Sequence, residues 1–457
     1  MFKRKVYDKL LEWKNISNQY ALFLEGARRI GKSTIAEEFA KNEYEDYLIL
    51  DFAIEGEDVK NEFRNNLSNM DSFFRNLFVH KGKELPPHKS VIILDEVQRF
   101  PLARQAIKYL VKDGRYDYIE TGSLISIKNN AEKILIPSEE YKVKMFPMDF
   151  EEFLWAQGDT ITIPVVKDAF KKCKPLGEAL HRKILSRFRE YMAVGGMPQA
   201  VNAYVNGATF GQIDFIKQQI LDLYEEDLRT YDSENRERAS VIFHTIPEQL
   251  NNHNSHFKFS VVDKTARYKN YIDAVGFVSE SMMGNECIGV TKPEIDMESY
   301  ADKSDFKLYM GDTGLLIAQM IRYNTDSKEE IYKKILFGKG GINYGMAMEN
   351  AVAQALRASG HSLYFHRYVY NEGDFGENDK NSTTRTKNYE IDFMIVRKQK
   401  ICPIEVKSSN YRTHKSFDYL RKKYSWLKLQ DQYVIYTKDI QRVDDIVYIP
   451  VYMTMFL

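Results

Sequence analysis

Residues 23–34 read FLEGARRIGKST, which is the end of an apolar strand, a turn bounded by glycines and the start of a helix. Gly26 is followed after four residues by Gly31, Lys32 and Ser33, which is the spacing of a P-loop. Glycines let the backbone curl so that its N–H groups face phosphate oxygens, and the helix N-terminus adds partial positive charge. An ordinary strand–helix turn is the alternative. The predicted phosphate-binding residues are Gly26, Ala27, Arg28, Arg29, Ile30, Gly31, Lys32, Ser33 and Thr34.

The ligand that this loop predicts is ATP with Mg²⁺. Lys32 is expected to reach the β- and γ-phosphates, and the Ser33 hydroxyl is expected to ligate the metal. Residues 91–99, VIILDEVQR, supply the partner, because Asp95 emerges at the carboxyl end of an apolar strand. Asp95 is predicted to hold Mg²⁺ through water. Glu96 is predicted to be the catalytic base that polarises the attacking water; a solvated acid after a strand is the alternative.

Residues 118–123, YIETGS, end the next strand. Thr121 or Ser123 is expected to project near the γ-phosphate, or else to cap the following helix. Five arginines are candidates for phosphate contacts or for an arginine finger, and the sequence does not choose among them. They are Arg28, Arg29, Arg99, Arg104 and Arg115.

Five apolar runs in residues 1–150 alternate with helical stretches. They are YALFLE (20–25), DYLILDF (46–52), SVIILDE (90–96), YDYIETG (116–122) and EYKVKMF (140–146). Continuous apolar strands separated by helices are typical of a parallel sheet that is buried on both faces. Residues 1–150 are therefore predicted to be an α/β domain.

The rest of the chain divides into three regions that differ in their helix and strand patterns. Helical patterns dominate residues 151–235, and a winged-helix-like unit is predicted for 236–330. Residues 331–457 carry a helix ending at Gly360, several strands and a polar stretch at 371–388 that is expected to form a loop. The acidic segment 223–232 is expected to be a solvated helix face, and the glycine pair in VGGMPQAV (194–201) to permit a tight turn.

Composition excludes several classes of protein. The net charge of the 457 residues is zero, so the chain as a whole is no polycation built for nucleic acid. Its three cysteines form no C-x-x-C pair, which argues against a disulfide framework or a zinc site. Without a secretory signal or an apolar run of about 18 residues, we expect a cytoplasmic protein with no membrane partner.

Residues 389–409, YEIDFMIVRKQKICPIEVKSS, contain a second motif. Asp392 and the pair Glu405 and Lys407 follow the pattern of PD-(D/E)xK nucleases, in which two carboxylates hold Mg²⁺ at a scissile phosphate. Strand alternation places Glu405 and Lys407 on one face, and Lys407 is expected to orient the attacking water. Glu349 on the preceding helix is the further candidate metal ligand.

The surroundings of this motif are basic. Residues 380–425 contain twelve Lys or Arg against four Asp or Glu, with tyrosines at 389, 411, 419 and 424. That pattern is compatible with a nucleic-acid backbone footprint. The alternatives are a solvated basic face, a nuclease scaffold that no longer cuts, and acids paired structurally with basic neighbours.

Several segments together resemble a prokaryotic family of AAA-type ATPases. They are GARRIGKST (26–34), IILDEVQRFPLARQAIKYLVKDGRYDYIETGSLIS (92–126), IPSEEYKVKMFPMDFEEFLWA (136–156), YMAVGGMPQAV (191–201) and FKLYMGDTGLL (306–316). In this archaeal-type P-loop ATPase family, an ATPase module precedes a C-terminal domain of uncharacterised function. The resemblance implies a P-loop core with an additional strand, a helical and winged-helix middle, and a C-terminal part similar to restriction-endonuclease folds.

The sequence therefore predicts a Mg²⁺-dependent ATPase in four parts: core 1–150, helical region 151–235, winged-helix-like region 236–330 and nuclease-like domain 331–457. The last two parts are expected to contact DNA, and cleavage of nucleic acid is one outcome. The alternative is a nucleotide-gated switch or interaction protein with an inactive nuclease-like domain. The third is an ATPase with no nucleic-acid role, and an oligomer is compatible with each of the three.

Overall fold

The computed structural model describes residues 1–122, 137–231, 238–252, 256–262, 267–323, 328–337, 344–371, 386–408 and 414–457. Ser123, Tyr411 and most of the predicted polar loop at 371–388 lie outside these residues. Within them, no helix combines the length and the apolar character that crossing a membrane requires.

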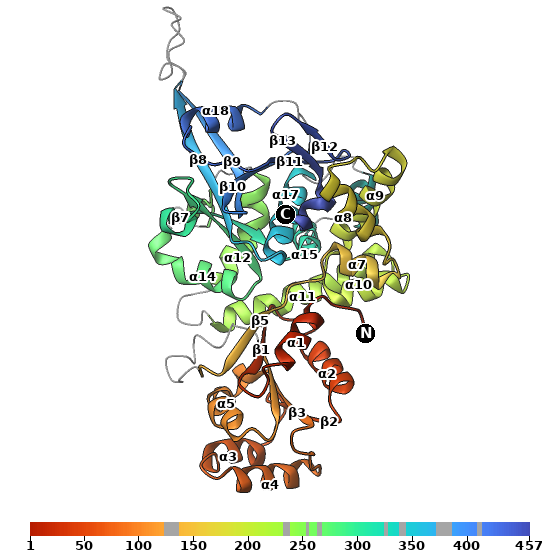
Figure 1. Cartoon of the computed structure of the whole chain (residues 1–457), viewed down its shortest axis with the longest axis vertical. Helices are drawn as coiled ribbons and strands as arrows, with labels where there is room; N and C mark the ends of the chain where they lie inside the picture. Colours follow the sequence, from red (N-terminus) through yellow and green to blue (C-terminus); the bar gives the residue numbers. More distant parts are fainter. Residues whose placement is uncertain are drawn as a thin grey trace, which may run out of the picture.

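The N-terminal lobe is built on a parallel sheet of five strands (Figure 1). Its strands are β1 (Ala21–Glu25), β2 (Asp46–Asp51), β3 (Ser90–Asp95), β4 (Asp117–Gly122) and β5 (Glu140–Lys144). The order is β2-β3-β4-β1-β5, so β4 separates the P-loop strand β1 from β3. The predicted parallel sheet is confirmed, and β4 occupies the place of the additional strand.

Helices cover both faces of this sheet, and β1 and β3 are therefore buried along their whole length. They are α1 (Val6–Lys14), α2 (Lys32–Glu43), α3 (Glu57–Asn65), α4 (Met70–Lys81) and α5 (Pro101–Asp113). Sequence signals fix the ends of α5, since Pro101 stands in its first turn and Gly114 follows with φ +77°.

Helices dominate the middle of the chain. They are α7 (Phe150–Ala156), α8 (Thr162–Lys172), α9 (Glu178–Val194), α10 (Pro198–Val205), α11 (Phe210–Tyr231), α12 (Arg238–Asn251), α13 (Phe259–Val262), α14 (Ile272–Glu280), α15 (Thr313–Met320) and α16 (Lys328–Phe337). In Figure 1, α11 lies between the N-terminal lobe and the rest of the molecule.

A second sheet of eight strands organises the C-terminal half. Its order is β12 (Gln441–Val443), β13 (Ile446–Pro450), β11 (Gln432–Tyr436), β10 (Lys400–Val406), β9 (Thr386–Arg397), β8 (Leu363–Asn371), β6 (Gly284–Val290) and β7 (Ala301–Met310). The helices α17 (Tyr344–Ala358) and α18 (Lys415–Lys423) pack with it. The sheet crosses the predicted boundary at residue 330, because β6 pairs with β8. The four-part division stays a prediction, with its last two parts sharing this sheet.

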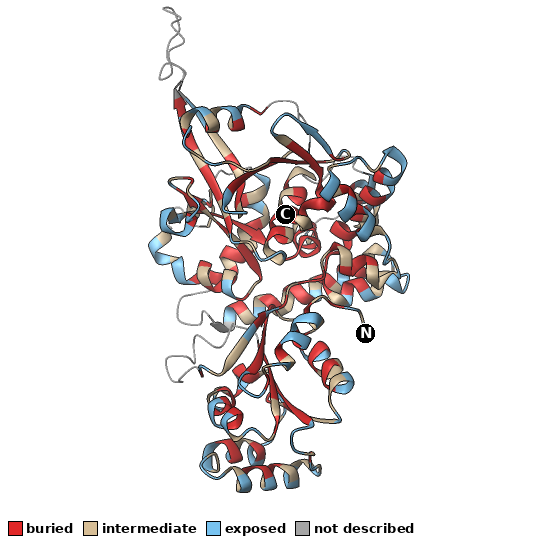
Figure 2. Cartoon of the chain, viewed as in Figure 1, coloured by how far each residue is buried: buried red, intermediate tan, exposed pale blue. Residues whose placement is uncertain are grey.

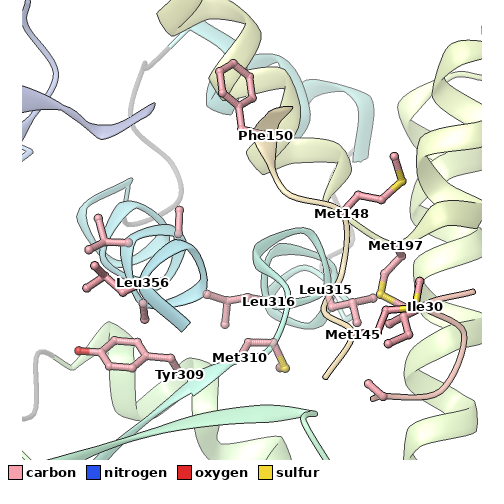
Figure 3. Close-up of a cluster of buried hydrophobic side chains, with 14 of the residues drawn as sticks. Ile30, Met145, Met148, Phe150, Met197, Tyr309, Met310, Leu315, Leu316 and Leu356 are labelled. Atoms are coloured by element: carbon pink, nitrogen blue, oxygen red, sulfur yellow. The ribbon is translucent and has the colours of Figure 1, made fainter. Parts of the chain in front are cut away.

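One apolar core links the two sheets. The same cluster includes Leu22 of β1, Ile30 of the P-loop, Met197 beside α10, Leu315 of α15 and Leu356 of α17. Buried positions accordingly run through the middle of the molecule in Figure 2. In Figure 3, Ile30, Met145 and Met197 gather beside Leu315, where the P-loop lobe meets the later helices.

Candidate nucleotide site and C-terminal acid cluster

The P-loop has the backbone shape that its glycines predict. Gly31 caps α2 with φ +93°, and Arg29 also has a positive φ, +68°. A Cβ on Gly26 would lie 2.3 Å from Ile30 Cδ1 and 2.5 Å from the Met145 carbonyl oxygen, so only glycine fits there. Left-handed residues within such a loop turn backbone N–H groups toward a common anion.

Lys32 is a buried cation inside this loop. Its Nζ donates to the carbonyl oxygens of Gly26 and Ala27 at 3.0 and 2.9 Å. Burial lowers the pKa of Lys32 to about 8, against the opposing effects of Glu96 and Asp95. Within the described residues, no carboxylate pairs directly with this ammonium. A phosphate bound in the loop would neutralise it, so the lysine fits the predicted anionic ligand.

Three oxygen-bearing side chains from neighbouring elements meet beside Lys32. The Ser33 hydroxyl at the start of α2 donates to Asp95 Oδ1 at 2.7 Å, and the Thr121 hydroxyl of β4 donates to the same oxygen. Asp95 is buried at the carboxyl end of β3, whereas Ser33 and Thr34 are exposed. Hydroxyl and carboxylate oxygens are the ligands that Mg²⁺ prefers, so this set fits the metal.

Glu96 follows Asp95 with a left-handed backbone, φ +54°. Its N–H donates to Thr121 Oγ1 at 3.3 Å, and its carboxylate accepts a hydrogen bond from Gln98 Nε2. The Thr121 hydroxyl therefore links the Asp95 carboxylate to the Glu96 backbone.

Some of the candidate arginines are held in ion pairs, and others are exposed. Arg104 is buried in a two-pronged ion pair with Glu140, at 2.6 and 2.7 Å, and Arg115 pairs with Asp113 and Asp71. Both are thus committed to structural partners. Arg29 and Arg99 are exposed.

Sequence reasoning missed the residues that hold the P-loop from outside. The Tyr224 hydroxyl donates to the Arg28 carbonyl oxygen at 3.0 Å, and Asp227 accepts from Arg28 Nη1 at 3.0 Å. Arg4 Nη1 donates to the Ile30 carbonyl oxygen at 3.0 Å. The expectation of a solvated acidic face at 223–232 is wrong for these positions, because Tyr224 and Asp227 face the loop. Their i, i+3 spacing is the signal that places them on one side of α11.

The glycine pair of VGGMPQAV has a packing role. Gly196 N–H donates to Asp312 Oδ2 at 2.6 Å, and Gly196 accepts from Met148 N at 2.7 Å. A Cβ on Gly196 would lie 2.2 Å from the Met148 carbonyl oxygen. Two segments of the predicted resemblance, 191–201 and 306–316, therefore meet in space.

In the C-terminal half, Glu349 and Glu390 surround a lysine that sequence reasoning missed. Lys307 Nζ lies 2.6 Å from Glu390 Oε1 and 3.6 Å from Glu349 Oε1, and the Tyr309 hydroxyl donates to Glu349 at 2.5 Å. Burial alone would lower the pKa of Lys307. Its carboxylate neighbours outweigh burial, so the pKa is raised.

Asp392 lies in a β-bulge near this group. Tyr364 pairs with Met394 while His366 pairs with Ile391, so the one residue between them on β8 faces two on β9. Asp392 accepts from the Val406 N–H at 2.8 Å. Burial raises its pKa well above the usual range, and the Glu349 carboxylate raises it further.

Glu405 lies on the α18 side of the sheet. Cys402 and Ile404 belong to the main core, whereas Ile401 packs with Phe417 of α18. Strand alternation puts Glu405 with Ile401, and it accepts a hydrogen bond from Ser416. Lys407 Nζ lies 2.7 Å from Glu405 Oε2.

The predicted metal ligands are engaged by lysines. Glu405 is paired with Lys407, and Glu349 neighbours Lys307. Asp392 is close enough to both glutamates for their charges to act on it. Among the described residues, no group of three or more Asp, Glu, His or Cys side chains is placed to hold a metal ion.

Tyr389, Tyr419 and Tyr424, the tyrosines of the basic segment that the structure describes, pack against other rings. The ring centroids of Tyr389 and Tyr419 are 4.8 Å apart, and those of Tyr370 and Tyr419 are 4.2 Å apart. Tyr424 is buried, with its hydroxyl 2.9 Å from His366 Nε2. Their packing accounts for these rings without a stacked base.

The fold and the loop together define a P-loop nucleotide-binding domain. Residues 18–154 match the family described as AAA domain, so this part of the chain is similar to AAA-type P-loop ATPases. Residues 185–327 and 344–453 match two domains of unknown function, DUF8612 and DUF4143.

No curated protein matches the chain. Among solved structures, protein VC1899 from Vibrio cholerae is 11% identical, over 90% of this chain and 95% of that chain, with a TM-score of 0.17. That score is too low to support an argument about fold.

Proposed function

We propose that this protein binds Mg·ATP at the P-loop and hydrolyses it. The observation that carries the proposal is the buried Lys32 ammonium, which lies beside an oxygen set of Ser33, Asp95 and Thr121. These groups come from α2, β3 and β4, and meet at the carboxyl ends of the parallel strands. The match of residues 18–154 to the AAA domain supports the same assignment.

Each residue has a separate task in this proposal. Lys32 and the loop N–H groups would bind the β- and γ-phosphates. Ser33 would hold Mg²⁺ directly and Asp95 through water, and the bound metal would neutralise phosphate charge. Glu96 accepts the proton of the attacking water. Thr121 orients both acids, since it contacts the Asp95 carboxylate and the Glu96 N–H.

Equilibrium binding of a non-hydrolysable ATP analogue with Mg²⁺ tests the nucleotide site. Lys32→Ala should weaken binding at least about 30-fold, because a charged contact of about 2 kcal/mol or more is lost. Lys41→Ala, at an exposed lysine of the same helix, is the matched control and should bind like wild type. Equal affinity of wild type and Lys32→Ala would refute the site.

For the C-terminal half, the contacts favour binding without cleavage. The helix–strand–strand–strand–helix–strand order from α17 to β11 supports a nuclease-like fold. The ion pairs of Glu405 with Lys407 and of Lys307 with Glu349 and Glu390 support an inactive one. We therefore propose a nucleotide-gated switch whose C-terminal part binds a partner, with DNA favoured by the basic segment at 380–425.

A cleavage assay on DNA and RNA with Mg²⁺ or Mn²⁺, with and without ATP, separates the two alternatives. Wild type should cut neither nucleic acid, and should shift DNA in a salt-dependent manner. Cleavage by wild type that disappears in Lys407→Ala would restore the nuclease alternative. Lys32→Ala would then show whether ATP controls it.

A further inference from the structure

The C-terminal half of α11 contacts the P-loop residue Arg28 through two side chains. Tyr224 donates to its carbonyl oxygen, and Asp227 accepts from its guanidinium, both at 3.0 Å. Tyr224 is buried, and the side chains of Arg28 and Asp227 are 30% and 19% exposed, so the ion pair lies half-buried beside a buried hydroxyl. The two contacts therefore fix both the backbone and the side chain of Arg28.

The charge of Asp227 opposes the ligand that the loop is built for. Asp227 lies close enough to influence Lys32, and Arg28, Arg99 and Glu96 all act on Asp227 itself. A carboxylate here competes with phosphate for Arg28, and it repels a triphosphate. Burial raises the pKa of Asp227, and the charges of Arg28 and Arg99 oppose that rise. Arg28 therefore both contacts Asp227 and favours its charged form.

We propose that Asp227 is a latch that occupies Arg28 in the nucleotide-free protein, and that Mg·ATP binding breaks the Arg28–Asp227 ion pair and releases the C-terminal half of α11. This inference rests on the proposed ATP site. Because Asp227 and the phosphates compete for the same guanidinium, the position of α11 would depend on whether nucleotide is bound.

Other contacts of α11 connect it to the C-terminal half of the molecule. Gln218 Nε2 donates to the Ala318 carbonyl oxygen of α15 at 2.8 Å, and Glu225 pairs with Arg322 just beyond α15. Asn350 of α17 in turn donates to Thr313 Oγ1 of α15 at 3.0 Å. Direct contacts thus lead from the P-loop through α11 and α15 to the helix that carries Glu349.

Calorimetric binding of the ATP analogue with Mg²⁺ to the full chain tests the latch. Asp227→Asn should bind roughly 5- to 150-fold more tightly than wild type, which is the usual range of a coupling between two sites. Asp227→Glu keeps the charge and should stay near wild type. Glu226→Gln removes one charge at the next, exposed position of α11 and should also leave the affinity near wild type.

Affinity that is unchanged or weaker in Asp227→Asn would overturn the latch. An affinity gain of the same size in Glu226→Gln would also overturn it, because the effect would then be general electrostatics. If wild type binds no nucleotide, the proposed function itself fails, and the latch falls with it. Binding by wild type that is lost in Lys32→Ala confirms the ATP site whatever the latch variants do.

Hydrogen–deuterium exchange on the wild-type protein tests the latch without any variant. Backbone amides of residues 220–231 should exchange faster when the analogue is bound, because the helix end loses the Asp227 ion pair to Arg28. The helix α4, which lies at the end of the same lobe farthest from α11 in Figure 1, should keep its exchange rates. Unchanged or slower exchange in 220–231 would contradict the release.

Discussion

Two buried lysines show how local partners decide what a cation can do. Lys32 has two carbonyl oxygens as hydrogen-bond partners, and its pKa is lowered to about 8. Lys307 is surrounded by Glu349, Glu390 and Asp392, which raise its pKa despite burial. The first lysine is poised to receive an anion, whereas the second already holds its anions.

The lowered pKa of Lys32 predicts a pH dependence of nucleotide affinity. Phosphate favours the charged ammonium, so the pKa of Lys32 is higher in the complex than in the free protein. The dissociation constant should be constant below about pH 8. Above it, the constant should rise by up to about tenfold per pH unit. Lys32→Arg, whose guanidinium stays protonated, should remove this rise. A flat wild-type profile from pH 7 to 9.5 would exclude the assignment.

Lys307→Met should destabilise the fold, because it leaves buried carboxylates without their cation. We expect a loss of about 3–5 kcal/mol at pH 8. Burial raises the pKa of Glu390 and Asp392, so the folded state takes up protons that the unfolded state does not. Stability of the variant therefore falls as pH rises, and the loss should be smaller at pH 5.

Chemical denaturation at pH 5 and pH 8 measures this loss. Lys303→Met changes an exposed lysine of the same strand and should stay within about 0.5 kcal/mol of wild type. A loss in Lys307→Met that is equal at both pH values would show that packing, and not charge, sets the cost.

At the scale of elements, the sequence predicts those strands and helices whose positions depend on the local pattern of apolar residues, glycines and prolines. Buried apolar residues fill β1 and most of β3, and apolar residues are prominent in β2 and β4. The predicted ends of all five strands lie within two residues of those observed. The Ser33 hydroxyl contacts Asp95, and Lys32 contacts the Gly26 carbonyl oxygen. The P-loop and Asp95 follow β1 and β3, two strands of one parallel sheet whose carboxyl ends lie at the same edge on either side of β4.

Contacts between distant parts of the chain escaped this reasoning. Tyr224 and Asp227 reach Arg28 only because α11 packs across the lobe, roughly 200 residues from the P-loop in sequence. Likewise, β6 joins β8 through a pairing that no local pattern signals. The bulge at Asp392 and the lysine partners of the C-terminal acids depend on the same kind of non-local packing.

The close approach at Gly196 gives a prediction for an element junction. Gly196→Ala should cost about 3 kcal/mol, because the new Cβ would meet the Met148 carbonyl oxygen at 2.2 Å. Gly56→Ala is the matched control, since Gly56 has open space around its Cα and a negative φ. Thermal unfolding of both variants measures the difference. Equal stability would show that the junction gives way easily.

At the scale of the whole molecule, a continuous core ties the nucleotide lobe to the second sheet. The same cluster contains P-loop, α15 and α17 residues, so the parts are packed against one another rather than tethered by linkers. A change at the P-loop can therefore reach the C-terminal half through direct contacts. This arrangement suits a switch, in which ATP chemistry at one end alters binding at the other.

Hydrolysis of ATP in the N-terminal lobe, with Glu96 as the base, is the proposed reaction. The most direct test is phosphate release from Mg·ATP by the full chain, comparing wild type with Glu96→Gln. We predict Mg²⁺-dependent release by wild type and a fall of roughly 10²- to 10⁴-fold in Glu96→Gln, which should still bind ATP. No release by wild type, or equal rates in the two proteins, would contradict the account.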